Sequence, residues 1–417
     1  MTRKGQVLRI AVIGAGYIGL PTAALLASKG FLVTAVDNNP KVVEQINEGV
    51  SPYPENGLQK LLTLGKATGC LVASSEVPNS DVFLITVPTP ITELFKPDLR
   101  HVYDAVEAIL DKLQLGNIVI IESTIPVNTT QNIAKLIEEK RPELFVFDND
   151  RNSAIKIAHC PERVLPGNLI EELVHNDRII GGVNEQSTQS AMNFYSEFVK
   201  GKIYGTDSRT AELSKLAENT FRDINIAFAN ELSQICDELS ISVWELIELT
   251  NRHPRVQILN PGPGVGGHCI AVDPWFIAES APQLSRLIQV ARQVNLDKES
   301  FVVAKILESL NAFNFKNLTL YGLTYKKNVA DFRNSPSINI LKQLSLAPNL
   351  KIEAVDPYFN LSNHGNLIPS LVSILPDGSE PKKDHLHVVL VGHDAFLNIN
   401  STAHPELHIL NFCERNI

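Results

Sequence analysis

Residues 8–19 read LRIAVIGAGYIG, and this stretch decides the fold of the N-terminal part of the chain. The branched apolar residues before Gly14 are typical of a buried parallel strand, and the run after Gly19, LPTAALLASKG, has the composition of a helix. Gly14 permits a tight turn, Gly16 omits the side chain that would block a pyrophosphate, and Gly19 lets the helix pack closely on the strand. The stretch therefore predicts a strand, a phosphate-binding turn and a helix.

The next apolar run ends in a carboxylate, which indicates the kind of dinucleotide that the turn binds. Leu32–Val36 leads into Asp37, about 20 residues after the glycines. A carboxylate at this point accepts hydrogen bonds from the adenosine ribose hydroxyls and repels the 2′-phosphate of NADP. We therefore predict NAD as the cofactor, with an ordinary surface aspartate as the alternative interpretation of Asp37.

A second informative stretch, PGPGVGGHCIAVDPWF at residues 261–276, sets one cysteine in a glycine-rich loop. The glycines before Cys269 let a ligand approach the backbone closely, and a buried structural cysteine does not require them. Asp273 follows four residues later. This pattern favours a nucleophilic thiol, and a turn that merely contains a cysteine is the alternative. Cys160 lacks neighbouring glycines and is expected to be a packed thiol instead.

Length and composition fit a large globular protein with more than one domain. The 417 residues are 44% hydrophobic, and the formal net charge of −9 argues against a nucleic-acid partner. No apolar run approaches the roughly 18 residues that span a membrane, and no signal-peptide pattern opens the sequence, so we expect a cytoplasmic protein without a membrane partner. The five cysteines show no CxxC spacing, so we expect neither a disulfide framework nor a metal site.

Polar residues follow two further apolar runs of the first domain. The run ending at Val87 leads to Thr89, and the run ending at Ile121 leads to Thr124. In an open α/β sheet, ligands lie beyond the carboxyl ends of the strands, so both threonines are candidate cofactor or substrate contacts. Ordinary turn or cap roles are the alternative.

The end of the first domain carries a charged loop. The apolar run 155–159 precedes Glu162 and Arg163, which are adjacent in the sequence and are candidate site residues. The alternative interpretation is a structural ion pair on a surface turn. Arg178–Gly182 is expected to be the last strand of this domain, which we end at residue 190.

A long stretch without Gly or Pro, residues 208–239, predicts a helix with an apolar face. Lys215, Asn219 and Arg222 fall on one narrow polar stripe of that helix, and a solvated helix face is the alternative for them. The loop at residues 251–255 then carries His253 and Arg255, whose basic side chains can neutralise a diphosphate or a sugar acid.

A second α/β unit is expected from about residue 317. Short apolar runs at Leu318–Leu323, Lys351–Asp356, His387–Gly392 and Leu407–Phe412 predict its strands. The predicted fold is therefore α/β, with two Rossmann-like doubly wound domains joined by a long central helix and a helical middle domain. The expected boundaries are 1–190 for NAD binding, 191–300 for the helical middle with the cysteine loop and dimer interface, and 301–417 for the third domain.

The motifs occur along the chain in the order GAGYIG, Asp37, VPTP, EST, CPERVLPG, SKLAENTFRD, HPRV, PGPGVGGHCIAVDPWF and YKKNVADFRNSP. This order resembles the UDP-glucose/GDP-mannose dehydrogenase superfamily, the UDP-sugar 6-dehydrogenases, over nearly the whole chain. The resemblance implies an NAD-dependent, four-electron oxidation of a sugar C6 alcohol to a carboxylate, in a homodimer or higher homo-oligomer built on the central helix. The NRHPRV and GHCIAVDPWF segments are most similar to members that oxidise UDP-N-acetyl-D-mannosamine for surface polysaccharide biosynthesis.

The resemblance, together with the chemistry, assigns roles to named residues. A thiolate at Cys269 traps the aldehyde as a thiohemiacetal, and its oxidation gives a thioester. Lys215 takes up the alcohol proton, and Asn219 donates a hydrogen bond to the same oxygen. Three residues hold the lysine or line the side from which water attacks: Asp273, Thr124 and Glu162. Relatives tend to have a second carboxylate where this chain has Leu165-Pro166-Gly167, so Glu162 as the base for hydrolysis is our hypothesis.

The resemblance also assigns binding residues. On the UDP-sugar it places Arg163, Val164, Lys215, Asn219, Arg222, His253, Arg255, Gly266, Tyr325 and Lys326. On NAD it places Tyr17, Ile18, Asp37, Thr89, Thr124 and Arg333, beside the three glycines of the turn.

Three alternatives stay open. A relative that oxidises UDP-N-acetylglucosamine would use the same catalytic residues. A two-electron dehydrogenase of the 3-hydroxyacyl or 6-phosphogluconate type shares the N-terminal turn but needs no glycine-framed cysteine. A non-catalytic NAD-binding regulator would need none of Lys215, Asn219, Cys269 and Asp273.

Overall fold

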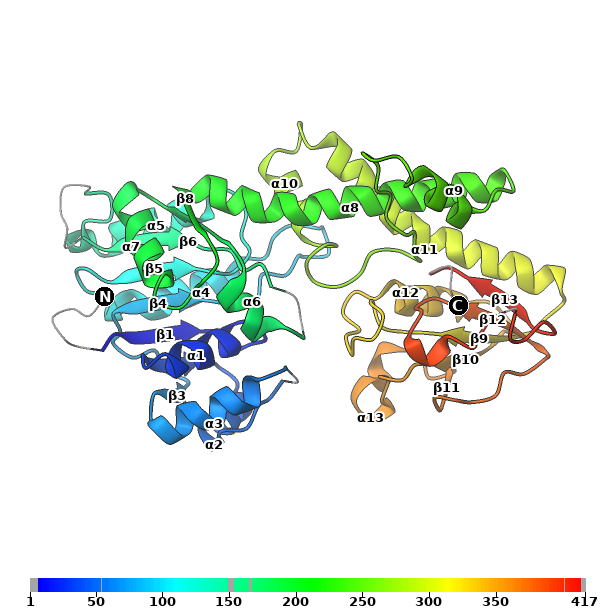
Figure 1. Ribbon diagram of the computed structural model, residues 1–417, viewed down its shortest axis with the longest axis horizontal. Coiled ribbons are helices and arrows are strands. Elements are labelled where there is room, and N and C mark those ends of the chain that lie inside the picture. Colours follow the sequence, from blue (N-terminus) through cyan, green and yellow to red (C-terminus); the bar gives the residue numbers. More distant parts are fainter. Residues whose placement is uncertain (1–6, 54, 149–153, 165–166, 401, 414–417) are drawn as a thin grey trace. The chain divides into compact units, whose positions relative to one another are not determined.

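The computed structural model describes residues 7–53, 55–148, 154–164, 167–400 and 402–413, and the chain divides into two compact units. Unit 1 comprises Met1–Ala217 with Trp275–Ser280, and unit 2 comprises Glu218–Pro274 with Ala281–Ile417. Each unit is built around its own largely parallel sheet (Figure 1). The division into three domains at residues 190 and 300 stays a prediction.

Unit 1 contains an eight-stranded sheet in the order β3-β2-β1-β4-β5-β6-β7-β8. Its strands are β1 (Arg9–Ile13), β2 (Leu32–Val36), β3 (Leu71–Ser74), β4 (Val82–Ile85), β5 (Ile118–Ile121), β6 (Lys156–His159), β7 (Arg178–Gly182) and β8 (Ile203–Asp207). Neighbouring strands are parallel except for the antiparallel pair β6 and β7. The strand order reverses between β1 and β4, so a topological switch point lies there.

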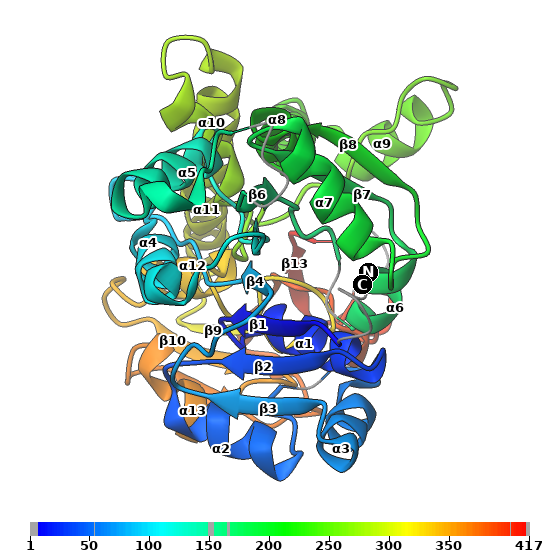
Figure 2. The same ribbon diagram turned by 90° about the vertical axis from the view of Figure 1, so that its left-hand side faces the viewer.

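Helices cover both faces of this sheet because successive strand residues point to opposite sides. Ile10 and Val12 enter one hydrophobic core, and Ala11 and Ile13 enter the other. Figure 2 shows α4 and α5 on one side of the sheet and α6 and α7 on the other. The helices of unit 1 are α1 (Gly19–Ser28), α2 (Pro40–Glu48), α3 (Leu58–Thr68), α4 (Arg100–Ile109), α5 (Thr129–Lys140), α6 (Leu169–His175) and α7 (Glu185–Tyr195), with 3-10 turns η1 (Leu110–Lys112) and η2 (Pro142–Leu144).

The sheet of unit 1 extends one strand beyond the one expected to be last. β8 pairs in parallel with β7, although its sequence, IYGTD, carries no run of apolar residues. Tyr204 in its middle is 51% exposed. An edge strand of this kind needs no hydrophobic face on both sides, so the sequence pattern did not indicate it.

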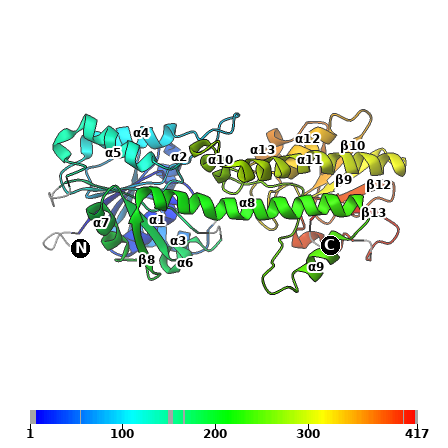
Figure 3. The ribbon, with the colours of Figure 1, turned by 90° about the horizontal axis from the view of Figure 1, so that it is seen from above.

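Four helices follow the first sheet. They are α8 (Ser208–Glu238), α9 (Val243–Thr250), α10 (Asp273–Ser280) and α11 (Arg286–Ala312). The predicted helix over residues 208–239 is thus confirmed. Within unit 2, α8 and α11 lie side by side (Figure 3), joined by a buried ion pair of 2.6 Å between Asp223 and Arg292. None of the described helices is long and apolar enough to cross a membrane.

Unit 2 contains a five-stranded parallel sheet in the order β11-β10-β9-β12-β13. The strands are β9 (Asn317–Tyr321), β10 (Lys351–Val355), β11 (Ser373–Leu375), β12 (His385–Val389) and β13 (His408–Asn411), with α12 (Pro336–Leu344), α13 (Leu361–His364), η3 (Gly365–Leu367) and η4 (Asp394–Phe396). The strand order reverses between β9 and β12, which repeats the switch point of unit 1. The fold class expected from the sequence is confirmed.

The strand predicted at His387–Gly392 begins earlier and ends earlier, because β12 spans His385–Val389. Its two histidines are buried and bonded to residues of β9 rather than exposed at a strand end. His385 Nδ1 lies 2.8 Å from the Thr319 hydroxyl, and His387 Nδ1 lies 3.1 Å from the Tyr321 hydroxyl.

Candidate active site

The glycine turn after β1 is held by backbone contacts that only glycines allow. Gly14 has a φ of +96°, a conformation that L side chains rarely adopt. A Cβ on Gly19 would come closer than 3.0 Å to the Gly14 carbonyl oxygen and to the Thr86 hydroxyl. That hydroxyl donates a hydrogen bond of 2.8 Å to the Gly14 carbonyl. Thr86, at the end of β4, therefore fixes the turn, and the sequence did not single it out.

Gly16 differs from the other two glycines because a Cβ there would meet no protein atom within 4 Å. The missing side chain consequently leaves space for something outside the protein. The ten-residue helix α1 begins three residues later, and the positive end of its dipole favours an anion. A dinucleotide pyrophosphate fits both features.

Asp37 occupies the position expected for a ribose-binding carboxylate. It directly follows β2, and its two oxygens accept hydrogen bonds from the backbone N–H groups of Ala15 (3.0 Å) and Asn39 (2.9 Å). The bond to Ala15 ties the carboxylate to the glycine turn. The residues of unit 1 therefore fit NAD at this end of the sheet.

Tyr17, two residues before the start of α1, is linked to a more distant loop. Its hydroxyl donates to Glu55 Oε2 at 3.1 Å, and its ring meets that of Tyr53 edge to face. Glu55 also accepts hydrogen bonds from the backbone N–H groups of Gly167 and Leu169, each at 2.9 Å. The turn that leads into α1 is thus connected to the segment after the Glu162 loop.

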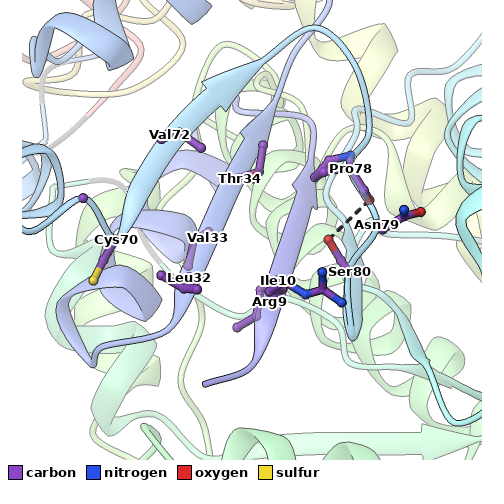
Figure 4. A pocket seen from close by; sticks show the side chains of 11 residues that line it. Arg9, Ile10, Leu32, Val33, Thr34, Cys70, Val72, Pro78, Asn79 and Ser80 are labelled. Atoms are coloured by element: carbon purple, nitrogen blue, oxygen red, sulfur yellow. Dashed lines mark hydrogen bonds between the residues drawn. The ribbon is translucent and has the colours of Figure 1, made fainter. Parts of the chain in front are cut away.

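The other predicted NAD contacts of unit 1 lie at the same edge of the sheet. Ile18 is the N-cap residue of α1, and the half-buried Thr89 and Thr124 follow β4 and β5. At the opposite, amino-terminal ends of the strands there is a separate hollow of about 390 Å³ (Figure 4). It is lined by residues such as Arg9 and Leu32, and it does not coincide with the carboxyl ends where ligands of such sheets bind.

Glu162 lies in a buried environment that suits a general base. Burial raises its pKa to about 7, although the charges of Lys215 and Arg178 act in the opposite direction. Its Oε1 has no hydrogen-bond partner within the described ranges. A carboxylate that titrates near neutral pH is suited to take a proton from water there.

A buried cluster lies around this loop. The Tyr195 hydroxyl donates to Glu122, and the Arg178 guanidinium lies 5.7 Å from the centre of the Tyr195 ring. Burial raises the pKa of Cys160 to about 12, so its thiol stays protonated near neutral pH. Cys160 is also 0% exposed, which agrees with the packed thiol that the sequence predicts.

In unit 2, Cys269 begins a turn that leads directly into α10. Its carbonyl accepts hydrogen bonds from the backbone N–H groups of Val272 (3.0 Å) and Asp273 (2.9 Å). Asp273 is the first residue of α10 and is 3% exposed. The Asn219 side-chain amide donates to Asp273 Oδ2 at 2.6 Å. Two of the predicted catalytic side chains are thus bonded to each other at the base of the cysteine turn.

The glycines before Cys269 allow the loop to pack on the segment after β9. Gly267 N–H donates to the Arg333 carbonyl at 3.0 Å, and the Asn334 amide donates to the Gly267 carbonyl at 3.1 Å. A Cβ on Gly266 would lie 2.6 Å from the Asn334 carbonyl oxygen and 2.8 Å from the Cβ of Tyr325. Any larger residue at Gly266 would force the two segments apart.

Arg333 and Tyr325 lie close enough to Cys269 to interact with it electrostatically. A hydrogen bond with Asp331 raises the pKa of Arg333, and the Cys269 thiolate adds to that effect. The Arg333 guanidinium lies 2.6 Å from the Asp331 carboxylate. A nearby cation favours the thiolate form of a cysteine. The structure places Arg333 in this set within unit 2, and its contact with NAD stays a prediction.

A cavity of about 220 Å³ lies at the switch point of the second sheet. It is lined by the loop after β9, including Tyr325, Lys326 and Lys327, by Leu390–Gly392 after β12, and by Asn260–Gly264. Two lysines at the carboxyl ends of parallel strands suit an anionic ligand such as a diphosphate. The sequence predicted Tyr325 and Lys326 for this role.

The remaining predicted substrate contacts are not among the residues that line this cavity. His253 and Arg255 are exposed in the loop after α9, where His253 Nδ1 accepts from the Arg255 backbone N–H at 3.3 Å. Arg222 is exposed on α8. In unit 1, Arg163 donates to the Asp177 carbonyl at 3.3 Å, and Val164 packs against the hydrophobic core. Lys215 is half-buried on α8, one helical turn before Asn219.

Comparison with known proteins identifies the family. Residues 8–199, 209–297 and 319–409 match the NAD binding, central and UDP binding domains of the UDP-glucose/GDP-mannose dehydrogenase family. The chain belongs to this family. It is an NAD-dependent dehydrogenase that acts on a UDP-sugar, and the family, enzyme class and cofactor expected from the sequence are confirmed.

Three similar proteins are named for two N-acetylated sugars. The chain is 44% identical to the UDP-N-acetyl-D-mannosamine dehydrogenase of Campylobacter jejuni, over 98% of this chain and 100% of that protein. It is 43% identical to the NDP-N-acetyl-D-galactosaminuronic acid dehydrogenase of Ralstonia nicotianae, over 94% and 92%. The solved UDP-D-ManNAc dehydrogenase of Pyrococcus horikoshii is 35% identical, with a TM-score of 0.85 and coverage of 98% and 96%.

Proposed function

We propose that the protein oxidises UDP-N-acetyl-D-mannosamine at C6 to the uronic acid in two successive steps at one carbon. The observation that carries this proposal is the cysteine turn of unit 2, in which Asp273 starts α10 four residues after Cys269 and accepts the amide hydrogen bond of Asn219. A two-electron alcohol dehydrogenase needs no such thiol. The product is expected to feed surface polysaccharide synthesis.

The first step requires removal of the alcohol proton. Lys215 is the proposed acceptor, and Asn219, one turn further along α8, donates a hydrogen bond to the oxygen on which charge develops. Because the Asn219 amide is bound to Asp273, its orientation is fixed before substrate arrives. The glycine turn and Asp37 would hold NAD, which would supply the acceptor for the hydride that leaves C6.

The second step keeps the aldehyde on the protein. The Cys269 thiolate adds to the aldehyde carbon, the oxygen is protonated, and a thiohemiacetal forms. Loss of that proton and of a second hydride, for which a second NAD would be the acceptor, gives a thioester. Arg333 lies within electrostatic range of Cys269, and a nearby cation is the kind of group that stabilises a thiolate.

Hydrolysis then releases the acid. Glu162 takes a proton from water, the hydroxide attacks the thioester carbonyl, and the Cys269 thiolate leaves. Thr124 is assigned to the water side as well. In total C6 loses four electrons as two hydrides, and one water is consumed. The pKa of Glu162 near 7 supports this assignment of the base.

The UDP part of the substrate is assigned to the cavity of unit 2. Tyr325 and Lys326 line that cavity, and Lys327 adds a second cation. Gly266 supports the loop position of Tyr325 through close packing. Five further residues stay proposed substrate contacts, although they do not line this cavity: Arg163, Val164, Arg222, His253 and Arg255.

We also propose a homodimer that forms through α8. Three large apolar residues spaced seven apart, Phe221, Phe228 and Ile235, are 69%, 52% and 46% exposed. Residues seven apart lie on the same face of a helix, so the three form one apolar stripe. A second copy of the chain offers the same stripe, and an isologous contact would bury both.

The substrate assignment is tested by following NADH formation with UDP-N-acetylmannosamine, UDP-N-acetylglucosamine and UDP-N-acetylgalactosamine. We expect the manno sugar to give a kcat/KM at least tenfold above the others. The galacto sugar is the second candidate, because the Ralstonia relative carries a name for that product at nearly the same identity. If the protein prefers one of the other two sugars, the four-electron mechanism still holds, but the assignment of UDP-N-acetylmannosamine as the substrate is wrong.

A further inference from the structure

The loop that lines the cavity of unit 2 is anchored by a buried histidine outside it. His393 is 0% exposed and directly follows the cavity residue Gly392. It belongs to the segment after β12, and it contacts the segment after β9 that carries Tyr325 and Lys326. The proposed function gives His393 no role.

The hydrogen bonds of His393 define its tautomer. Its Nδ1 accepts from the Asn328 backbone N–H at 2.9 Å, so the ring proton of a neutral imidazole sits on Nε2. Nε2 lies 3.0 Å from the Thr324 hydroxyl and 3.3 Å from Asp356 Oδ2. The Thr324 hydroxyl in turn donates to the Lys326 carbonyl at 3.0 Å. The imidazole therefore holds both ends of the segment 324–328.

Asp356, at the end of β10, holds the start of the same segment. Its Oδ2 accepts from the backbone N–H groups of Leu323 (2.6 Å) and Thr324 (3.2 Å), and its Oδ1 accepts from Tyr358 (2.8 Å). Burial acts to raise the pKa of Asp356, but hydrogen bonds from His393 and from these backbone groups outweigh it and keep the carboxylate charged. His393 and Asp356 thus form a buried pair that contacts three strand ends of the sheet.

We infer that His393, together with Asp356, is a positioning residue for UDP-sugar binding: it fixes the backbone of Thr324–Asn328 so that Tyr325 and Lys326 face the diphosphate. The inference rests on the proposed assignment of those two residues to the UDP part of the substrate. His393 itself lines no part of the cavity. Its effect passes through the Asn328 N–H and the Thr324 hydroxyl.

The other buried histidines of the sheet provide a matched control. His387 is also 0% exposed, but its nitrogens meet the Tyr321 hydroxyl and the Lys382 carbonyl. Neither partner belongs to the segment 324–328. Substitution at His387 should therefore perturb the core to a similar extent without moving the loop.

The test measures the Kd of UDP by titration calorimetry on the full-length protein, with NAD binding as a second readout. His393→Phe removes both ring nitrogens and leaves the Asn328 N–H without its acceptor, so we expect UDP to bind roughly tenfold or more weakly. His393→Asn places an amide oxygen near the position of Nδ1, so we expect binding within about threefold of wild type. His387→Phe should leave the UDP affinity within about twofold, and NAD affinity should change in none of them.

Four variants decide the outcome. Lys326→Ala should weaken UDP binding on its own; if it does not, the assignment of this cavity to UDP is wrong. If Lys326→Ala weakens binding and a folded His393→Phe protein binds UDP normally, the positioning role of His393 is refuted. A His393→Asn protein that binds UDP as weakly as His393→Phe, or a His387→Phe protein that loses the same affinity, would also overturn it.

Discussion

Replacement of Gly16 by alanine should separate cofactor binding from folding. A Cβ at Gly16 meets no protein atom within 4 Å, and its φ is not in the left-handed region that excludes other residues. The folded protein therefore accommodates the methyl group. Because alanine restricts the unfolded chain more than glycine does, stability should stay level or rise by about 0.4–1 kcal/mol.

The Gly16→Ala substitution should instead weaken the binding of NAD. The methyl group occupies space that the turn leaves open to the pyrophosphate, and inserting a methylene into a packed contact costs about 1–3 kcal/mol. That range corresponds to a roughly 5- to 150-fold higher Kd for NAD. The affinity for UDP, which we assign to unit 2, should not change.

Gly19→Ala is the matched control because its Cβ would overlap the Gly14 carbonyl and the Thr86 hydroxyl. We expect it to lower the melting temperature, whereas Gly16→Ala should not. Thermal melting and calorimetric titration of NAD measure the two properties. A Gly16→Ala protein that melts as early as Gly19→Ala, or that binds NAD normally, would refute the reasoning.

Four further outcomes are expected. Burial raises the pKa of Glu162 to about 7, and the base must be deprotonated to act. The kcat should therefore fall by about tenfold between pH 8 and pH 6. A Glu162→Gln protein whose kcat falls with decreasing pH in the same way would contradict this. Asp37→Ala should lower the ratio of kcat/KM for NAD over NADP by roughly tenfold or more, and a wild type that uses both cofactors equally would exclude the role of Asp37. Asn219→Ala should lower kcat by roughly 10²-fold while the KM for NAD stays constant, and an unchanged kcat would remove its role at the oxygen. Phe228→Asp should convert the protein from a dimer to a monomer in light scattering, and a variant of unchanged mass would place the interface elsewhere.

Local periodicity and glycine placement made the fold predictable. Leu32–Val36 and the helix from Ser208 were found almost to the residue, because one is a continuous branched apolar run and the other lacks Gly and Pro. The edge strand β8 was missed because IYGTD carries neither pattern. The start of β12 was missed because the buried His385 is bonded to Thr319 of β9, and such pairing across a sheet leaves no signal in the sequence.

The site was predictable where one motif supplies the chemistry. Asp273 and Asn219 are bonded to each other, and both were named from their motifs. Thr86 and His393 could not be named from the sequence. Each supports a loop through hydrogen bonds to a segment far away in the chain, and such contacts are visible only in the folded structure. The pKa of Glu162 depends on its burial, which the neighbouring residues in the sequence do not indicate.

The number of NADH molecules formed per sugar tests the central claim most directly. The wild-type protein, given limiting UDP-N-acetylmannosamine and excess NAD, should form about two NADH per sugar with little free aldehyde, because Cys269 retains the carbon for the second oxidation. A Cys269→Ser protein should fold and bind NAD but form no acid. One NADH per sugar with wild-type protein, or near wild-type acid formation by Cys269→Ser, would contradict the four-electron mechanism.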